Sequence, residues 1–321
     1  MSILFETLHL KHFDPDALLH ILNNTEMEHQ LLARDNLTLH SEQLTIGDID
    51  ITVGDYDFSV RVRGSIPCDG KVYIGLLGKI IDEVRVNRSL VQLEQLVLYA
   101  PGCELDFHTL SGSNWYMLHL SLERLQEMAI DKLGMELDWP CQGVRFIDLS
   151  PEVSERLHKE LRGLLQFGKQ CVNTANTEAI ESLISEGMMQ MLAETIVQGS
   201  CSSLSRLSPG RERALNVLEA NIYHWMEYPN SGFCVSDIEG ISQRLLEMAC
   251  QETYGVTPHR WIKLARLNAA YRELCSDSGA SVTQTCMRWG FGNMGRFSGE
   301  YRALFGEFPK ETIQRVSQSV S

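Results

Sequence analysis

The sequence contains no run of eighteen consecutive apolar residues, no Cys-x-x-Cys pair, no Gly-x-Ser-x-Gly motif and no Walker loop. The first absence argues against a transmembrane helix, which needs about 20 predominantly apolar residues. The second argues against a structural zinc site or a dithiol redox centre. The last two remove common signals of α/β-hydrolases and P-loop NTPases. No motif therefore indicates an enzyme.

Disulfides are also not indicated, because the nine cysteines are an odd number and are scattered singly. This pattern favours reduced, mostly buried thiols, and it leaves open a redox-sensing thiol, whose reactivity depends on its local pKa. The first residues lack the basic start and the apolar run of a signal peptide. We therefore expect a cytoplasmic protein without a membrane partner.

Basic residues are scarce: 28 Lys and Arg face 42 Asp and Glu, for a net charge of −14. From residue 210 onward, however, 12 basic and 12 acidic residues balance, so the whole excess lies in residues 1–209. A neutral second part has no broad basic field for nucleic acid. If it binds DNA, individual arginines must carry recognition, and the affinity should depend on salt.

Residues 1–200 are expected to form one domain in which strands precede two helices. Residues 44–120 contain alternating or β-branched runs between turn residues, whereas residues 14–33 have helical spacing. Apolar residues at helical spacing follow twice: Val153, Leu157, Leu161, Leu164 and Leu165, then Ile180, Leu183, Ile184, Met188, Met191 and Leu192. The small, polar residues 201–210 predict a linker, and residues 211–321 predict a helical domain.

Near the C-terminus, Gly290, Gly292 and Gly295 match G-x-G-x-x-G, the fingerprint of a dinucleotide-binding loop. That loop requires a buried strand before the glycines, whereas residues 282–289 have apolar positions at helical spacing. Residues 297–305 repeat this spacing. We therefore expect Gly290 to end a helix in a left-handed conformation, within a helix-turn-helix.

This helix-turn-helix pattern occurs twice, at an offset of 51 residues. Each copy has apolar residues at helical spacing, a glycine and then a proline: Leu246, Cys250, Tyr254, Gly255 and Pro258, and Phe297, Tyr301, Phe305, Gly306 and Pro309. Between the copies, a helix of about seventeen residues would be about 25 Å long. Such a spacer could present two recognition helices to major grooves about 34 Å apart.

These residues resemble the AraC/XylS family of transcriptional regulators, whose signature is matched in residues 254–274 and 281–312. The resemblance is clear over residues 210–315, and residues 1–200 share only the general plan. It implies an α+β two-domain protein, with an N-terminal cupin-like β-barrel and a helical dimerisation pair, then an all-α double helix-turn-helix domain.

The resemblance also implies a function. A family member would bind promoter DNA as a homodimer and contact RNA polymerase, most often as an activator. It would need no cofactor, and its N-terminal domain would sense a small-molecule effector or mainly dimerise. The sequence departs from the family pattern in the first unit, where only Glu239 separates Ile238 from Gly240, and Cys250 replaces a usual aromatic residue.

The helix faces opposite the apolar positions supply the candidates for DNA contact. They are Ser242, Gln243, Arg244, Glu247 and Met248 in the first unit, and Asn293, Gly295, Arg296, Gly299 and Arg302 in the second. Arg296, in the first turn, is expected to bond a guanine bidentately, and Arg302 to bind phosphate. In the first unit, Ser242 fits a helix N-cap and Arg244 a base edge.

A rival interpretation is a metal-dependent cupin-type enzyme with a helical interaction domain. Glu104, Asp106 and His108 alternate along one predicted strand and so share a face, with His119 on a nearby strand. The two histidines, two residues apart, that cupin metal sites use are absent. We therefore expect no metal site and no catalysis.

The strand-rich domain could also hold an effector. An interior lined by Tyr99, Trp115, Tyr116 and Met117 would suit a small, partly apolar ligand, although such residues also form ordinary cores. The methionine-rich residues 186–192 leave two alternatives, an adaptable dimer seam or core filling.

Overall fold

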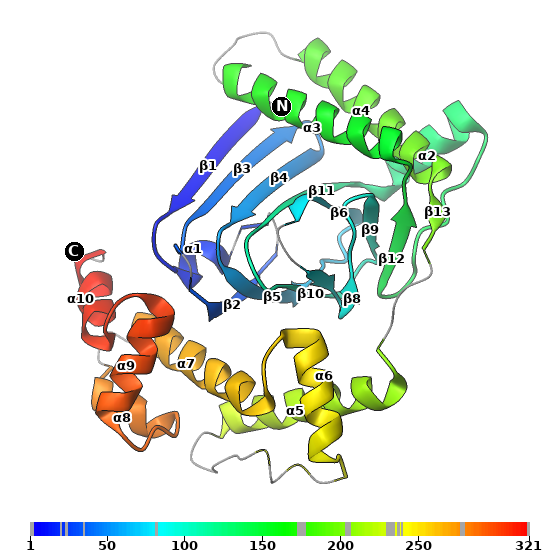
Figure 1. The fold of residues 1–321 in the computed structure, drawn as a ribbon. Helices are drawn as coiled ribbons and strands as arrows, with labels where there is room; N and C mark the ends of the chain where they lie inside the picture. Colours follow the sequence, from blue (N-terminus) through cyan, green and yellow to red (C-terminus); the bar gives the residue numbers. More distant parts are fainter. Residues whose placement is uncertain are drawn as a thin grey trace. The chain divides into compact units, whose positions relative to one another are not determined.

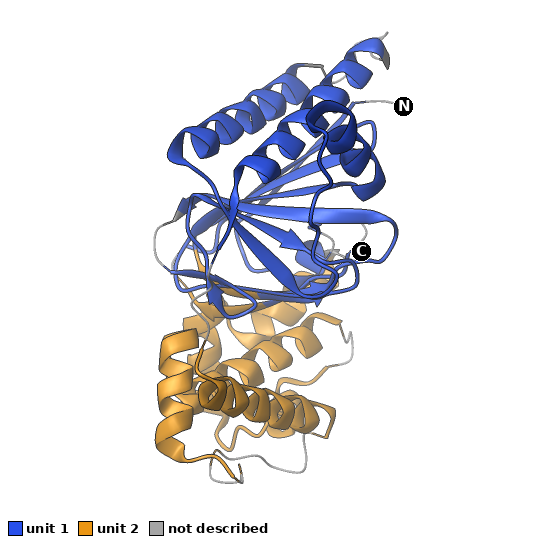
Figure 2. Ribbon diagram, turned by 90° about the vertical axis from the view of Figure 1, so that its right-hand side faces the viewer, with its two compact units in different colours: residues 1–29, 36–57, 62–205 blue, residues 30–35, 58–61, 206–321 orange. Residues whose placement is uncertain are grey.

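The computed structural model describes residues 3–19, 21–22, 25–34, 36–80, 83–171, 178–202, 207–228, 235, 238, 240–276 and 280–319. Their contacts group into two compact units (Figure 2). Unit 1 comprises Met1–His29, Asn36–Asp57 and Val62–Ser205, and unit 2 comprises Gln30–Asp35, Phe58–Arg61 and Arg206–Ser321. Of the predicted linker, Cys201 lies in a strand and Pro209 begins a helix.

The N-terminal part of the chain is built mainly from strands (Figure 1). They are β1 (Leu4–Leu10), β2 (Glu28–Ala33), β3 (Leu39–Ile46), β4 (Ile49–Tyr56), β5 (Ser59–Ser65), β6 (Lys71–Ile80), β7 (Val84–Val86), β8 (Ser89–Leu90), β9 (Gln95–Tyr99), β10 (Glu104–Thr109), β11 (Ser113–Ser121), β12 (Val144–Asp148) and β13 (Ser200–Cys201). The predicted strand-rich region between residues 44 and 120 is therefore confirmed.

The strands form two sheets. One has the order β1-β3-β4-β11-β6-β9-β12-β13, and the other β2-β5-β10-β7-β8. Among the described strands, hydrogen bonding does not join the two sheets into one ring, so the expected cupin-like β-barrel is corrected to two sheets that do not close. A closed ring needs every strand to be hydrogen-bonded on both sides, whereas β1 and β13 each end the first sheet.

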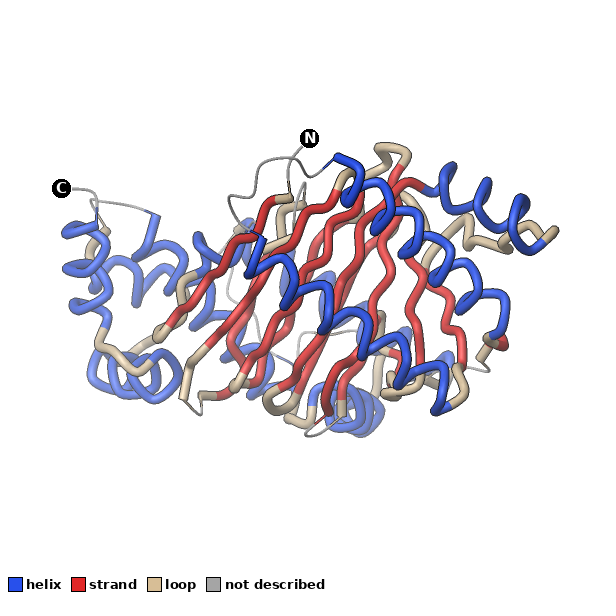
Figure 3. Tube along the Cα trace, turned by 90° about the horizontal axis from the view of Figure 1, so that it is seen from above, coloured by secondary structure: helices blue, strands red, loops and turns tan. Residues whose placement is uncertain are grey.

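Helices cover one face of the eight-stranded sheet (Figure 3). They are α2 (Leu122–Leu133), α3 (Pro151–Cys171) and α4 (Glu178–Gln198). The two long helices confirm the predicted pair. The Val153 N–H donates to Ser150 Oγ at the start of α3 (3.3 Å). Apolar residues from the sheet and the helices form one core, which includes Leu44, Ile51, Leu118, Leu157, Leu161, Leu165, Met188, Met189 and Leu192. Met188 and Met189 therefore fill the core.

The helix predicted over residues 14–33 is wrong for most of its length. Among the described residues of this segment, only α1 (Pro15–Leu19) is helical, and β2 occupies its end. In β2 four consecutive residues, His29 to Leu32, are buried. A strand with both faces covered buries consecutive residues, which an amphipathic helix does not. Tertiary packing therefore overrides the local spacing.

The described cysteines are less buried than expected. Cys250, Cys275 and Cys286 are buried, whereas Cys68, Cys141 and Cys201 are exposed. The prediction of mostly buried thiols is therefore wrong for unit 1, because its exposed cysteines lie in loops or in a two-residue edge strand. Separately, no helix among the described residues combines the length and apolarity needed to cross a membrane.

The described part of unit 2 consists mainly of helices. Its helices are α5 (Pro209–Glu227), α6 (Gln243–Tyr254), α7 (Pro258–Ser276), α8 (Val282–Arg288), α9 (Met294–Phe305) and α10 (Pro309–Ser319). The 51-residue repeat is confirmed, since α6 and α9 are both 12 residues long. Both end at a left-handed glycine, Gly255 (φ 64°) and Gly306 (φ 84°). A proline then begins the next helix, as the family signature implies.

Unit 2 contains a buried ion pair. The Arg61 guanidinium lies 2.6 Å from Glu219 Oε1, and it also lies over the rings of Tyr254 and Trp261, at 5.4 and 5.2 Å. The Tyr254 hydroxyl donates to the same carboxylate oxygen. Because both charges are paired and hydrogen-bonded, their desolvation is compensated.

Candidate nucleic-acid interface

The second helix-turn-helix consists of α8, a glycine turn and α9. Gly290 has φ 71° and ends α8, as predicted. A helix, and no strand, therefore precedes the glycine motif, which excludes the dinucleotide-loop geometry. The Asn293 side chain accepts a hydrogen bond from the Arg296 N–H (2.9 Å) and so caps α9. Capping fixes the residue at which α9 begins and hence the direction of its first turn.

The packing of α9 buries one face of the helix and leaves the opposite face exposed to solvent. Phe297 and Tyr301 are fully buried, and Leu304 and Phe305 are 3% exposed. The predicted contact residues Asn293, Gly295, Arg296, Gly299 and Arg302 are all exposed. A β-carbon built at Gly299 meets no atom within 4 Å. Intramolecular packing therefore does not require glycine at this position, and the helix backbone is accessible there.

The first unit presents α6 in the same way. Ser242 caps the helix by accepting from the Leu245 N–H (3.3 Å), which confirms the predicted cap. Leu246, Ala249 and Cys250 are buried, whereas Ser242, Gln243, Arg244, Glu247 and Met248 are exposed. Burial raises the pKa of the Cys250 thiol to about 12, so this cysteine is inert core material.

The shortened segment of the first unit is described only in part. Val235 and Ile238 are buried, and Gly240 has φ 76°. The intervening Glu239 lies outside the described residues. Gly240 thus has the left-handed conformation of a turn glycine and lies just before the α6 cap.

Helix α7 is the predicted spacer between the two units. It has 19 residues, which gives a length of about 28 Å. Twelve of its residues are buried, so it is held along its length and acts as a rigid element. The spacing between α6 and α9 is therefore fixed by structure that lies within unit 2.

The charged residues around Arg296 include two that the sequence did not single out. Glu300 Oε1 lies 3.2 Å from Arg296 Nε and 3.0 Å from Lys263 Nζ. Burial would raise the pKa of Glu300, but hydrogen bonds from Lys263 and Arg296 outweigh it and lower the pKa. The Arg296–Glu300 pair could have been found from its i, i+4 spacing. The bond from Lys263, on α7, could not.

Two other candidates have partners in the free protein. Gln243 Nε2 donates to Glu247 Oε1 (3.0 Å) along α6, and the Arg302 guanidinium lies 4.5 Å from the Phe308 ring centre. Asn293 has a defined structural role as the cap of α9.

The sequence could have indicated this cap, because asparagine directly before a periodic apolar segment is a common N-cap. Sequence reasoning also missed Met294, which is 40% exposed in the first turn of α9.

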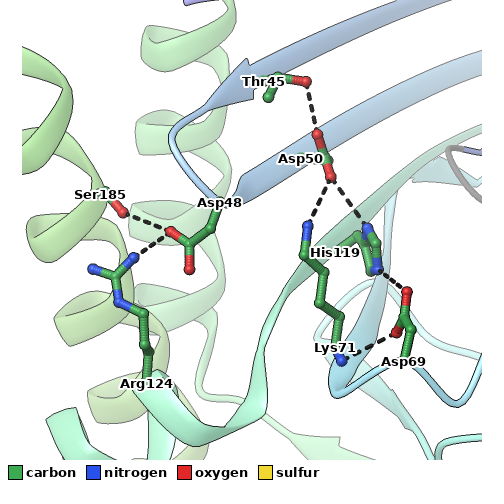
Figure 4. A network of polar contacts seen from close by, with 8 residues as sticks. All are labelled: Thr45, Asp48, Asp50, Asp69, Lys71, His119, Arg124 and Ser185. Carbon is green, nitrogen blue, oxygen red and sulfur yellow. Dashed lines mark hydrogen bonds and ion pairs between the residues drawn. The ribbon is translucent and has the colours of Figure 1, made fainter. Parts of the chain in front are cut away.

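The structure does not bring the rival metal-site residues together. Glu104 and Asp106 lie near Arg63, with N–O distances of 3.6 and 3.9 Å. His119 instead bonds Asp50, at 3.1 Å between Nδ1 and Oδ2 (Figure 4). Among the described residues, no group of three or more His, Cys, Asp or Glu is arranged to hold a metal ion.

The His119 cluster is a structural network near the end of the eight-stranded sheet (Figure 4). Asp50 also accepts from Thr45 (2.7 Å) and lies 3.6 Å from Lys71 Nζ. Burial would raise the pKa of Asp50, but the hydrogen bonds from His119 and Thr45 and the charge of Lys71 lower it. Asp50 is therefore held as a carboxylate that joins β3, β4, β6 and β11.

Comparison with known proteins gives consistent matches. Residues 235–315 match a family described as a helix-turn-helix domain. A probable thc operon regulatory protein of Rhodococcus erythropolis is 28% identical over 212 residues, which cover 62% of this chain and 61% of the relative. XylDLEGF operon transcriptional activator 1 of Pseudomonas putida is 23% identical over 211 residues, with the same two coverages. The chain thus spans about three fifths of the length of these curated relatives.

A solved structure also matches. It is a probable AraC family transcriptional regulator from Rhodopseudomonas palustris, 34% identical, with a TM-score of 0.29; the match covers 32% of this chain and 97% of that one. Transcriptional regulation, which the names of these relatives describe, agrees with the helix-turn-helix repeat, its left-handed glycines and the match over residues 235–315. The helix-turn-helix part of the chain therefore belongs to the AraC/XylS type of transcriptional regulator.

Proposed function

We propose that the chain activates transcription by binding promoter DNA through α6 and α9 and contacting RNA polymerase, and that it is not an enzyme. One observation carries this proposal: two capped helices each present an exposed arginine in the first turn, Arg244 and Arg296. The rigid α7 fixes their separation. Recognition helices place first-turn side chains against base edges in the major groove, and a curated relative is an operon activator.

The proposal is tested by binding to the DNA upstream of the chain's own gene and to scrambled DNA, across a salt series. We expect Arg296→Ala to lose about 1–3 kcal/mol of the preference for upstream DNA, because it removes one bidentate base contact from α9. Binding to scrambled DNA should persist. Fluorescence anisotropy with both duplexes measures the two affinities.

Arg302→Ala is the matched control, since it removes the same charge from the same helix. It should weaken binding to both duplexes equally and reduce the salt slope by about 1. If Arg296→Ala also weakens both duplexes equally, Arg296 does not read bases. If the wild type binds no double-stranded DNA above background, the proposed function is wrong.

The N-terminal plan of the family extends the proposal to dimerisation. Two sheets followed by a helical pair follow the order of a cupin-like sensor domain. On α4, Ile180 and Leu183 are 47% and 72% exposed. Exposed apolar residues on a paired helix support a surface for a second copy of the chain. Analytical ultracentrifugation measures the mass of the purified chain in solution. A monomer mass at micromolar concentration would contradict this part of the proposal.

A cavity between the two sheets of unit 1 supports an effector site. It has a volume of about 40 Å³, and its lining is almost entirely apolar. The four residues predicted to face the interior, Tyr99, Trp115, Tyr116 and Met117, all line it. Burial raises the pKa of Tyr99 well above its usual range, so its hydroxyl stays neutral. The apolar lining suits a small apolar ligand with one polar group. A ring-sized ligand needs more than about 40 Å³, so its binding would have to move the two sheets apart.

Phenol should therefore raise the melting temperature of the chain more than toluene, which has a similar shape but no hydroxyl. At one hundred times the dissociation constant, a ligand stabilises its site by about 2.7 kcal/mol, which corresponds to roughly 5–10 °C. Tyr99→Phe should reduce the difference between the two compounds. Equal melting temperatures with and without both compounds would favour a regulator that works without a small molecule.

A further inference from the structure

A groove of about 300 Å³ lies in unit 2 between α7 and the first turns of α9. Lys263, Arg266 and Arg296 line it, together with His259. Glu300 is the one acidic side chain among the described residues that line the groove. The groove thus gathers cationic groups beside the recognition helix, and a single carboxylate lies among them.

The position of Glu300 sets the conformations of two of these cations. One oxygen, Oε1, accepts from Lys263 Nζ at 3.0 Å and from Arg296 Nε at 3.2 Å. The Glu300 side chain is 22% exposed, whereas that of Arg296 is 77% exposed. The half-buried carboxylate of Glu300 therefore holds the exposed guanidinium of Arg296, which lies one helical turn earlier on α9.

The atom of Arg296 that Glu300 holds is Nε. The guanidinium has five N–H groups, so its two terminal nitrogens remain to make the parallel pair of bonds that reads a guanine. An arginine that is already oriented loses less side-chain entropy when it binds. The contact thus prepares Arg296 for base recognition without occupying the atoms that recognise the base.

The charge of Glu300 has a second consequence. Lys263 and Arg296 would otherwise be free to bind phosphates on DNA of any sequence, which gives affinity without specificity. Glu300 neutralises part of this attraction and repels phosphate directly. The terminal nitrogens of Arg296 can still replace bound water with a guanine, because Arg296 can make this contact while its Nε stays bonded to Glu300.

We propose that Glu300 is a specificity-determining positioning residue, which orients Arg296 toward a base and restrains Lys263 and Arg296 from binding phosphates of any sequence. This inference rests on the proposed DNA-binding function. Glu300 itself need not touch DNA. Its effect is exerted through Arg296, so it should appear in the ratio of two affinities rather than in either affinity alone.

The test compares Glu300→Gln with the wild type on upstream and scrambled duplexes between 50 and 200 mM salt. Glu300→Gln keeps the size of the side chain and removes its charge. We expect the preference for upstream DNA to fall about three- to tenfold, as one side chain loses its preorganisation. Binding to scrambled DNA should become tighter, with a salt slope steeper by about 1 to 2, as up to two cations gain access to phosphate.

Two further variants separate charge from position. Glu300→Asp keeps the charge but shortens the side chain, so it should reduce the preference without steepening the salt slope. Glu252→Gln is the matched control, because Glu252 pairs with Arg211 at the other end of a recognition helix, on α6. It removes the same charge and releases an arginine, and we expect an unchanged preference. Melting curves establish that each variant is folded.

Two results would overturn the inference. If Glu300→Gln keeps the wild-type preference, Glu300 does not position Arg296, whatever the change in salt slope. If Glu252→Gln loses as much preference as Glu300→Gln, net charge and not position sets specificity. These failures differ from failure of the proposed function, in which the wild type itself has no preference for any sequence.

Discussion

Phe297→Ala should destabilise the second helix-turn-helix by about 3–5 kcal/mol, the usual cost of truncating a fully buried phenylalanine. The Phe297 side chain has 0% exposure, and its ring lies 4.8 Å from that of Phe291 and 5.6 Å from that of Tyr301. Tyr301 in turn contacts Tyr271 of α7, with ring centres 5.8 Å apart. Losing Phe297 therefore loosens α9 from both the turn and the spacer helix.

Hydrogen exchange of the α9 amides in a denaturant series measures this loss in the relevant element, whereas a global probe would mix both units. Met287→Ala is the control, since Met287 is 70% exposed on α8, and it should change stability by less than about 0.5 kcal/mol. Equal protection of α9 in Phe297→Ala and the wild type would contradict the packing described here.

Acid should destabilise unit 1 through His29. Burial lowers the pKa of His29 to about 4, despite a hydrogen bond from Nδ1 to the Met27 carbonyl (2.9 Å). The unfolded chain, with an ordinary histidine pKa of about 6.5, binds this proton more readily, so stability is complete above pH 6.5 and falls as the pH drops toward 4. The loss over this window should be about 3 kcal/mol.

Urea unfolding at several pH values between 7.5 and 4 measures this loss. His29→Gln is the comparison, because glutamine cannot take up a proton in this range. The variant should be less stable than the wild type at pH 7.5, since glutamine fits the site less well, but its stability should fall less steeply with acid. Parallel pH profiles for the two proteins would mean that other groups cause the acid sensitivity.

Local sequence periodicity predicted the parts of the fold that are local in structure. The apolar positions of α9 identified its buried face, because a helix turns every 3.6 residues whatever it packs against. The same reasoning assigned the exposed face of α6 and the left-handed conformation of Gly290. Each of these depends only on neighbours within one or two turns.

What the sequence could not predict depends on distant pairing. β1 pairs with β3, whose paired residues lie 29 to 41 positions further along the chain, and β2 is a strand although its residues have helical spacing. The bond between Lys263 and Glu300 joins two helices whose relative position follows from the whole unit 2 core. Asn293 shows a different limit: its exposure was expected correctly, but its side chain serves the helix cap.

The most direct test of the central claim is selection of binding sites from random DNA, with the wild type, Arg244→Ala and Arg296→Ala in parallel. Two recognition helices joined by a rigid spacer should select two short conserved blocks for each bound copy of the chain, with centres about 10 base pairs apart. Each variant should lose sequence preference in one block and keep it in the other. A single conserved block, or loss in the same block for both variants, would contradict the account.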